Sequence, residues 1–227
     1  MMNKKNSLIL PPQFFEKDFE KKLSYIFKLS IDVLYLFDHF KNPIDAGKPT
    51  YKFMDKVFTL YEKVKNEIEI GVCVLNVNAR DSEILIEDII DPLLELKNIN
   101  LGLGTGDNKY EKHDFIFNND IEEIIKYILN NNNFISNNST LFIGGNSQSK
   151  IDLFKKYNLG INQWMGSDSD FLNKQNIYKN LINPKGSLSR CVNVKKKYEF
   201  DYEQIFVVKD SNLKIFQETI DNIFKND

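Results

Sequence analysis

The sequence predicts one α/β domain of three layers, in which helices cover both faces of a mainly parallel central sheet. Short and almost wholly apolar segments, such as 31–37, 70–77 and 140–143, have the pattern of strands that are buried on both faces. Segments with helical periodicity lie between them, and this alternation is typical of a parallel sheet. A chain of 227 residues with 42% hydrophobic residues is long enough to bury one such core.

The expected strands follow one another at intervals that leave room for a helix between most of them. Residues 1–29 are expected to form a lead-in that contains a helix, and residues 30–227 the α/β domain. The polar stretch 130–138 is expected to be a loop. The expected strands cover 31–37, 70–77, 83–90, 99–103, 140–143, 161–165, 190–194 and 204–208.

The helices are predicted from apolar residues that recur on one face and from residues that favour helix ends. Thr50 is expected to cap the amino end of the helix 50–66, and Asn158 is expected to end the helix 149–157. The expected helices cover 14–29, 50–66, 91–97, 120–129, 149–157, part of 168–181, and 211–224.

Composition argues against several classes of function. A net charge of −2 gives no electrostatic footprint for nucleic acid or for an anionic membrane surface. The chain has no apolar run long enough to cross a membrane, so we expect a cytoplasmic protein. Its two cysteines, Cys73 and Cys191, are expected to be buried free thiols.

A glycine-rich segment, Gly102-Leu103-Gly104-Thr105-Gly106, follows an expected strand. Glycine lets a backbone approach a phosphate or a cofactor closely. The segment is similar to the first motif of class I S-adenosylmethionine-dependent methyltransferases, which would imply a divergent enzyme on a Rossmann-like fold. The residues that follow, 107–113, are polar rather than the start of an apolar helix.

Asp168 and Asp170 lie two residues apart, as in the metal-binding Asp-x-Asp motif of nucleotide-sugar transferases. The competing interpretation is that Ser167 or Asp168 caps the helix that follows.

Taken in order, the expected elements resemble a von Willebrand factor type A (VWA) domain over residues 30–225. Ile31–Asp38 is similar to the first strand of that family and its terminal aspartate. Leu103-Gly104-Thr105 resembles the turn that carries the threonine of the family's metal site. The segment 205–216 resembles the closing strand and helix. The resemblance implies a three-layer, Rossmann-like (VWA-like) fold.

The resemblance also implies a metal-ion-dependent adhesion site, of which this chain keeps only part. Asp38 and Thr105 match the family's ligands, whereas Phe40, Asn42 and Gly144 stand at three other ligand positions. Magnesium requires near-octahedral oxygen ligands, so we expect a vestigial site at Asp38, Asn42 and Thr105 and no bound cofactor. Binding of Mg²⁺ or Mn²⁺ would require Asn42, Asp45 or Ser147 to act as a substitute ligand.

These observations favour a non-catalytic, intracellular interaction module that binds a protein partner, within a multiprotein assembly, through loops at the carboxyl ends of its strands. The alternatives are the divergent enzyme, an adhesion module with a repaired metal site, and a structural subunit of an oligomer. The expected partner-binding residues are Phe40, Asn42, Gly104, Thr105, Tyr110, His113, Gly145, Asn146 and Ser147.

Overall fold

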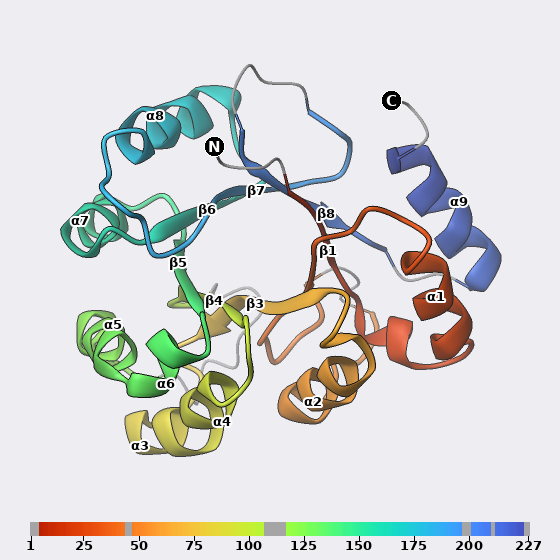
Figure 1. The fold of residues 1–227 in the computed structure, drawn as a ribbon, viewed down its shortest axis with the longest axis horizontal. Helices are drawn as coiled ribbons and strands as arrows, with labels where there is room; N and C mark the ends of the chain where they lie inside the picture. Colours follow the sequence, from red (N-terminus) through yellow and green to blue (C-terminus); the bar gives the residue numbers. More distant parts are fainter. Residues whose placement is uncertain (1–4, 44–46, 107–116, 197–200, 210–211, 225–227) are drawn as a thin grey trace.

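The eight strands of the protein form a closed barrel, with helices arranged around its outside (Figure 1). The computed structural model describes residues 5–43, 47–106, 117–196, 201–209 and 212–224. Each strand pairs in parallel with the next, and the last pairs in parallel with the first. The strands are β1 (Asn6–Ile9), β2 (Val33–Leu36), β3 (Glu69–Asn76), β4 (Asn100–Gly104), β5 (Thr140–Gly144), β6 (Gly160–Trp164), β7 (Leu188–Val192) and β8 (Glu203–Val207).

Within the described residues, a helix follows every strand except β7. This arrangement is that of the (β/α)₈ barrel. The helices are η1 (Pro12–Phe15, a 3₁₀ helix), α1 (Phe19–Ile26), α2 (Phe53–Val64), α3 (Ser82–Leu85), η2 (Ile86–Ile90, a π-helical turn), α4 (Asp91–Leu94), α5 (Ile121–Asn130), α6 (Asn132–Ser136), α7 (Gln148–Tyr157), α8 (Asp168–Tyr178) and α9 (Leu213–Phe224).

The prediction of an open, three-layer, Rossmann-like (VWA-like) sheet is wrong, because β1 joins the two edges that such a sheet would leave. Ser7 lies in register with Val33 of β2 on one side and with Ile205 of β8 on the other. β1 falls within residues 1–29, the segment expected to be a lead-in. It is only four residues long and precedes Pro11 and Pro12, so it has little of the pattern of a strand.

Two expected local structures also differ from those observed. Residues 83–90, expected to be a strand, are helical through α3 and η2, and α4 continues them. The buried residues Leu85, Ile89 and Leu93 recur every four positions, which is helical spacing. The expected loop 130–138 contains α6, which Asn131 caps by accepting a hydrogen bond from the N–H of Asn133.

Large aromatic residues fill the interior of the barrel, opposite glycines. The rings of Tyr35 on β2 and Phe142 on β5 meet edge to face, with centroids 6.0 Å apart. A Cβ at Gly71 would lie 2.4 Å from the Tyr35 ring, and a Cβ at Gly102 would lie 2.3 Å from the Phe142 ring. Gly71 and Gly102 therefore leave the space that these two rings occupy.

Polar contacts close the barrel at the amino ends of its strands. Glu203 accepts hydrogen bonds from the hydroxyls of Ser7 and Ser187. Glu69 pairs with Lys5 at 2.9 Å and accepts a hydrogen bond from Asn100. These contacts connect strands far apart in the sequence, and this end of such a barrel generally serves stability.

None of the described helices is long and apolar enough to cross a membrane.

Candidate ligand site at the mouth of the barrel

A cavity of about 240 Å³ opens among the carboxyl ends of the strands. In barrels of this type, ligands bind at this end, because the loops after the strands converge there. Residues from β1 to β6 and from the loops that follow them contribute to its wall. The lining residues are Ile9, Phe37, His39, Pro43, Cys73, Val74, Gly104, Thr105, Gly106, Gly144, Gly145, Lys150, Asn162 and Trp164.

Lys150 brings a cationic group into this cavity. It lies in the first turn of α7, and its Nζ donates a hydrogen bond to Oγ1 of Thr105 at 3.0 Å. Burial lowers the pKa of Lys150 below its ordinary value, because the charged form loses hydration. No carboxylate of the described chain forms an ion pair with its ammonium group.

Glycines make room for the stem of Lys150 and for its neighbours. Gly145 has a φ of +120°, and a Cβ there would lie 2.8 Å from Cδ of Lys150. Cβ atoms at Gly104 and Gly144 would lie 2.6 Å and 3.0 Å from side-chain atoms of Val74. The side chain of Val74 therefore packs closely against the backbone at Gly104 and Gly144, in the space that the two missing Cβ atoms leave.

Aromatic side chains form another part of the wall. Phe37 packs against His39, with ring centroids 5.9 Å apart, and both line the cavity. Trp164, at the end of β6, is 45% exposed although it also lines the cavity. The indole therefore offers an accessible face to a ligand, and it is the only tryptophan in the chain.

Asp38, expected as a metal ligand, is buried and engaged by an arginine. Its two carboxylate oxygens accept hydrogen bonds from Arg80 at 2.7 and 2.8 Å, and one also accepts from the N–H of Asn76. Asn42 lies within 3.5 Å of the side chain of Gln13, and Thr105 bonds to Lys150. The three expected ligands thus have protein partners.

Four of the expected partner-binding residues line two neighbouring cavities. Gly104, Thr105 and Gly145 line the mouth cavity. Phe40 lines a second cavity of about 160 Å³, which also contains Asp38 and shares Phe37 and His39 with the first. Asn146 and Ser147 lie in the loop before α7. Tyr110, His113 and Asp45 lie outside the described residues.

The two motifs expected to serve an enzyme have structural partners in the barrel. Gly102 faces the ring of Phe142, so only the later part of the glycine segment reaches the mouth. Ser167 caps α8 by accepting a hydrogen bond from the N–H of Asp170, which confirms the capping interpretation. Asp168 pairs with Arg190 at 2.6 Å.

No cluster of three or more histidine, cysteine, aspartate or glutamate side chains suited to a metal ion occurs in the part of the chain that the structure describes. Cys73 and Cys191 are buried and free, as predicted, and their sulfur atoms lie 3.8 Å apart. The hydrogen bond to Cys191, together with burial, raises the pKa of the Cys73 thiol well above its ordinary value.

No protein-family model and no curated protein matches this chain.

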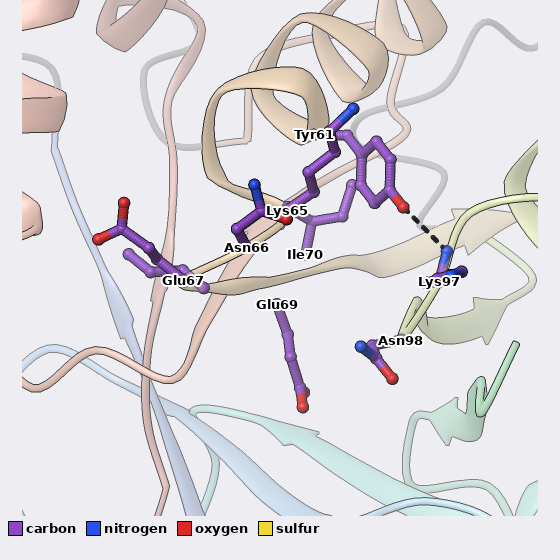
Figure 2. Close-up of a pocket in the computed structure, with 9 residues that line it drawn as sticks. Tyr61, Lys65, Asn66, Glu67, Glu69, Ile70, Lys97 and Asn98 are labelled. Carbon is purple, nitrogen blue, oxygen red and sulfur yellow. Dashed lines mark hydrogen bonds between the residues drawn. The ribbon is translucent and has the colours of Figure 1, made fainter.

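A further cavity, of about 150 Å³, lies at the opposite end of the barrel. Figure 2 shows Tyr61 of α2 reaching toward Lys97, whose backbone N–H donates to the phenol oxygen at 3.1 Å. Glu69 and Asn98, at the amino ends of β3 and β4, also line it. Because Glu69 already pairs with Lys5 and Asn100, we assign this cavity to the stabilising end of the barrel.

Sequence reasoning missed the residues that give the mouth its chemistry. Lys150 is one of 30 basic residues, and no local pattern distinguishes it. Trp164 stands near the end of the predicted strand 161–165, so its place at the mouth could have been inferred from the sequence. The sequence signal that could have identified this site is a strand that ends at Gly144-Gly145 and is followed by a helix. Such an order places the start of a helix at the ligand-binding end of the barrel.

Proposed function

We propose that this protein binds a small organic anion with a flat, apolar part in the mouth cavity, as the substrate or cofactor of an enzyme. The observation that supports the proposal best is Lys150, whose ammonium group lines the cavity and lacks an ion-pair partner within the described chain. A partly buried cation that lacks a counter-charge is unfavourable, and a phosphate or carboxylate of the ligand would supply the negative charge.

Two further features favour an anion at this place. Lys150 follows Ser147, the residue at which α7 begins, so the positive end of the helix dipole is close to its ammonium group. Neutral hydrogen-bond partners such as Thr105 hold the ammonium without neutralising it. An anionic ligand would therefore gain from the lysine and from the helix together.

The remaining wall favours a flat group. Trp164 and Phe37 supply aromatic surface, and Val74 supplies aliphatic surface over Gly104 and Gly144. A flat apolar group can therefore contact aromatic faces and an aliphatic side chain in the same cavity. That enzymes of this architecture place their active sites at this end supports the proposal by analogy of fold alone.

The test uses the fluorescence of Trp164, the only tryptophan of the chain. We would titrate the protein with flavin mononucleotide and with pyridoxine phosphate, and in parallel with riboflavin and pyridoxine, which lack the phosphate. We expect saturable quenching by at least one phosphorylated compound and a Kd at least about tenfold weaker for its uncharged counterpart, since a charge-assisted hydrogen bond contributes about 1.5–3 kcal/mol.

The matched variants are Lys150→Met and Lys155→Met, which remove one ammonium group each from the same helix. Lys155 is exposed, whereas Lys150 lines the cavity. We expect Lys150→Met to weaken binding of the phosphorylated compound at least about tenfold and to abolish its advantage over the uncharged one. Equal affinity in the two variants, or quenching by none of the compounds, would contradict the proposal.

The protein-interaction module expected from the sequence stays a prediction, because it involves a protein partner. The function proposed here involves only a small ligand in the mouth cavity.

A cytoplasmic location is part of the proposal. It is supported by Cys73 and Cys191, which are free although their sulfur atoms are 3.8 Å apart, as is typical of a reducing compartment.

A further inference from the structure

Lys174 is a buried lysine close to the mouth, and it belongs to α8. Its exposed fraction is 2%. The Nζ donates a hydrogen bond to Oδ1 of Asn146 and another, at 3.2 Å, to Oε1 of Gln163. Both acceptors are neutral amides, and the described residues give this ammonium group no ion pair with a carboxylate.

The two partners of Lys174 come from the loop after β5 and from the end of β6. Asn146 lies between Gly145, which lines the cavity, and Ser147, where α7 begins. Gln163 is the penultimate residue of β6, and its Nε2 donates to the backbone carbonyls of Met165 and Ser167 in the loop that precedes α8. Lys174 therefore connects the loop after β5 with the loop after β6.

The charge of Lys174 is held in an unfavourable environment. Burial lowers its pKa to about 8, with Asp170 on the same helix opposing this shift and Arg190 on β7 adding to it. The elements that supply its hydrogen-bond partners, β6 and the loop after β5, present neutral amides. An apolar side chain of similar length would fill the same space without the loss of hydration.

We propose that Lys174 is a positioning residue for the mouth cavity: its ammonium group fixes the segment Gly144–Ser147 and thereby the placement of Lys150 at the start of α7. The inference rests on the proposed function, because it assigns Lys174 a role in the same ligand site. Lys174 does not line the cavity itself, so it acts through Asn146 and the loop.

The first test needs no ligand. Hydrogen exchange of the backbone amides, followed by mass spectrometry at pH 7, compares the wild type with Lys174→Met and with Lys179→Met, an exposed lysine at the end of the same helix. We expect faster exchange in segment 144–150 for Lys174→Met alone. Unchanged exchange there would overturn the positioning role, whether or not a ligand is ever found.

The second test separates the charge of Lys174 from its bulk. The folded protein holds the pKa near 8, below the ordinary value of 10.5, so the unfolded state binds more protons between these two values. Stability of the wild type relative to Lys174→Met should therefore rise as the pH increases from 8 to 10. Asp170 and Arg190, the charged neighbours, and Lys150 are present in both proteins, so the difference reports Lys174. A flat difference would mean that Lys174 keeps its ordinary pKa in the folded protein and is therefore not buried against the two amides, which contradicts the proposal.

The third test measures flavin mononucleotide binding by Trp164 quenching at pH 7. We expect Lys174→Met to weaken binding several-fold, and Lys179→Met to leave the Kd unchanged. If the wild type binds no phosphorylated compound, the proposed function fails, yet the exchange experiment still decides whether Lys174 orders the loop. If the wild type binds and Lys174→Met binds equally well, the positioning role is wrong and the proposed function stands.

Discussion

Gly145 controls where the side chain of Lys150 can extend. Its φ of +120° lies in a region that side chains strongly disfavour, and the missing Cβ leaves the space that Cδ of Lys150 approaches. The glycine therefore has two roles: it lets the chain turn after β5, and it gives the lysine stem a path toward Thr105.

We expect Gly145→Ala to lower the free energy of unfolding by about 1–2 kcal/mol, since alanine is strained at this φ. It should also weaken binding of flavin mononucleotide, because the new methyl group displaces Lys150. Urea denaturation and Trp164 quenching measure the two effects. Ser147→Ala, in the same loop, is the control and should change neither by much. If Gly145→Ala kept full affinity for flavin mononucleotide, the side chain of Lys150 would not depend on the space that this glycine leaves.

For single residues, the sequence predicted where they lie in the fold better than it predicted what they contact. It placed Asp38, Thr105 and Gly145 at the carboxyl ends of strands, which is where they lie. It could not show that Asp38 pairs with Arg80, because that contact joins the ends of two strands and leaves no local pattern. The placement of Lys150 in the cavity is likewise a property of the assembled mouth, to which five strands and the segment after β2 contribute.

At the scale of single elements, the interior of the barrel depends on pairs of large and small residues on different strands. Gly102 on β4 lies against the ring of Phe142 on β5, and Gly160 on β6 lies against the Cβ of the same residue. A methyl group at Gly102 would lie 2.3 Å from that ring. The ring of Tyr35 also packs against the Phe142 ring, edge to face, and this contact restricts how far the Phe142 ring can move.

We expect Gly102→Ala to destabilise the barrel by about 1–3 kcal/mol through overpacking. Phe142→Leu alone should also destabilise it, because it leaves a cavity. The double variant should lose less than the sum of the two, since the smaller side chain admits the methyl group. Urea denaturation of the four proteins completes the cycle. Additive losses would mean that the two positions do not compete for space.

Most helices and strands could be predicted from the sequence, because their apolar residues recur at short intervals along the chain. The predicted strand 70–77 and helix 50–66 match β3 and α2 to within a few residues. The expected helix 91–97 overlaps α4, whereas the helical residues of α3 and η2 were predicted to be a strand, because the dense apolar residues obscure the helical spacing of Leu85, Ile89 and Leu93. Pro92 is tolerated at the start of α4, directly after the wider turn of η2.

At the scale of the molecule, the difference between an open sheet and a barrel lies in one strand. The same alternation of strands and helices suits both architectures, so the pattern alone does not decide between them. The decisive contacts join β1 to β8, for example Leu8 to Phe206 and Ile9 to Val207. A prediction that overlooks a four-residue strand therefore obtains the right class and the wrong topology.

A chain that begins at residue 12 tests whether β1 is required for closure. We expect this fragment to lose cooperative thermal unfolding by circular dichroism and to associate, because β2 and β8 would each expose an edge. Addition of a peptide with residues 1–12 should restore part of the transition. A fragment that is monomeric and melts cooperatively without the peptide would mean that the remaining seven strands suffice.

The pairing of β1 with β8 also has a consequence for synthesis on the ribosome. About 200 residues separate these strands in the sequence, and at roughly 5–20 residues per second their translation takes about 10–40 s. Throughout this time the nascent chain holds β1 with one edge unpaired, and Leu8 and Ile9 are apolar. Until β8 has been made, the strand that covers this edge in the finished barrel does not exist, so the edge of β1 stays open to pairing with other chains.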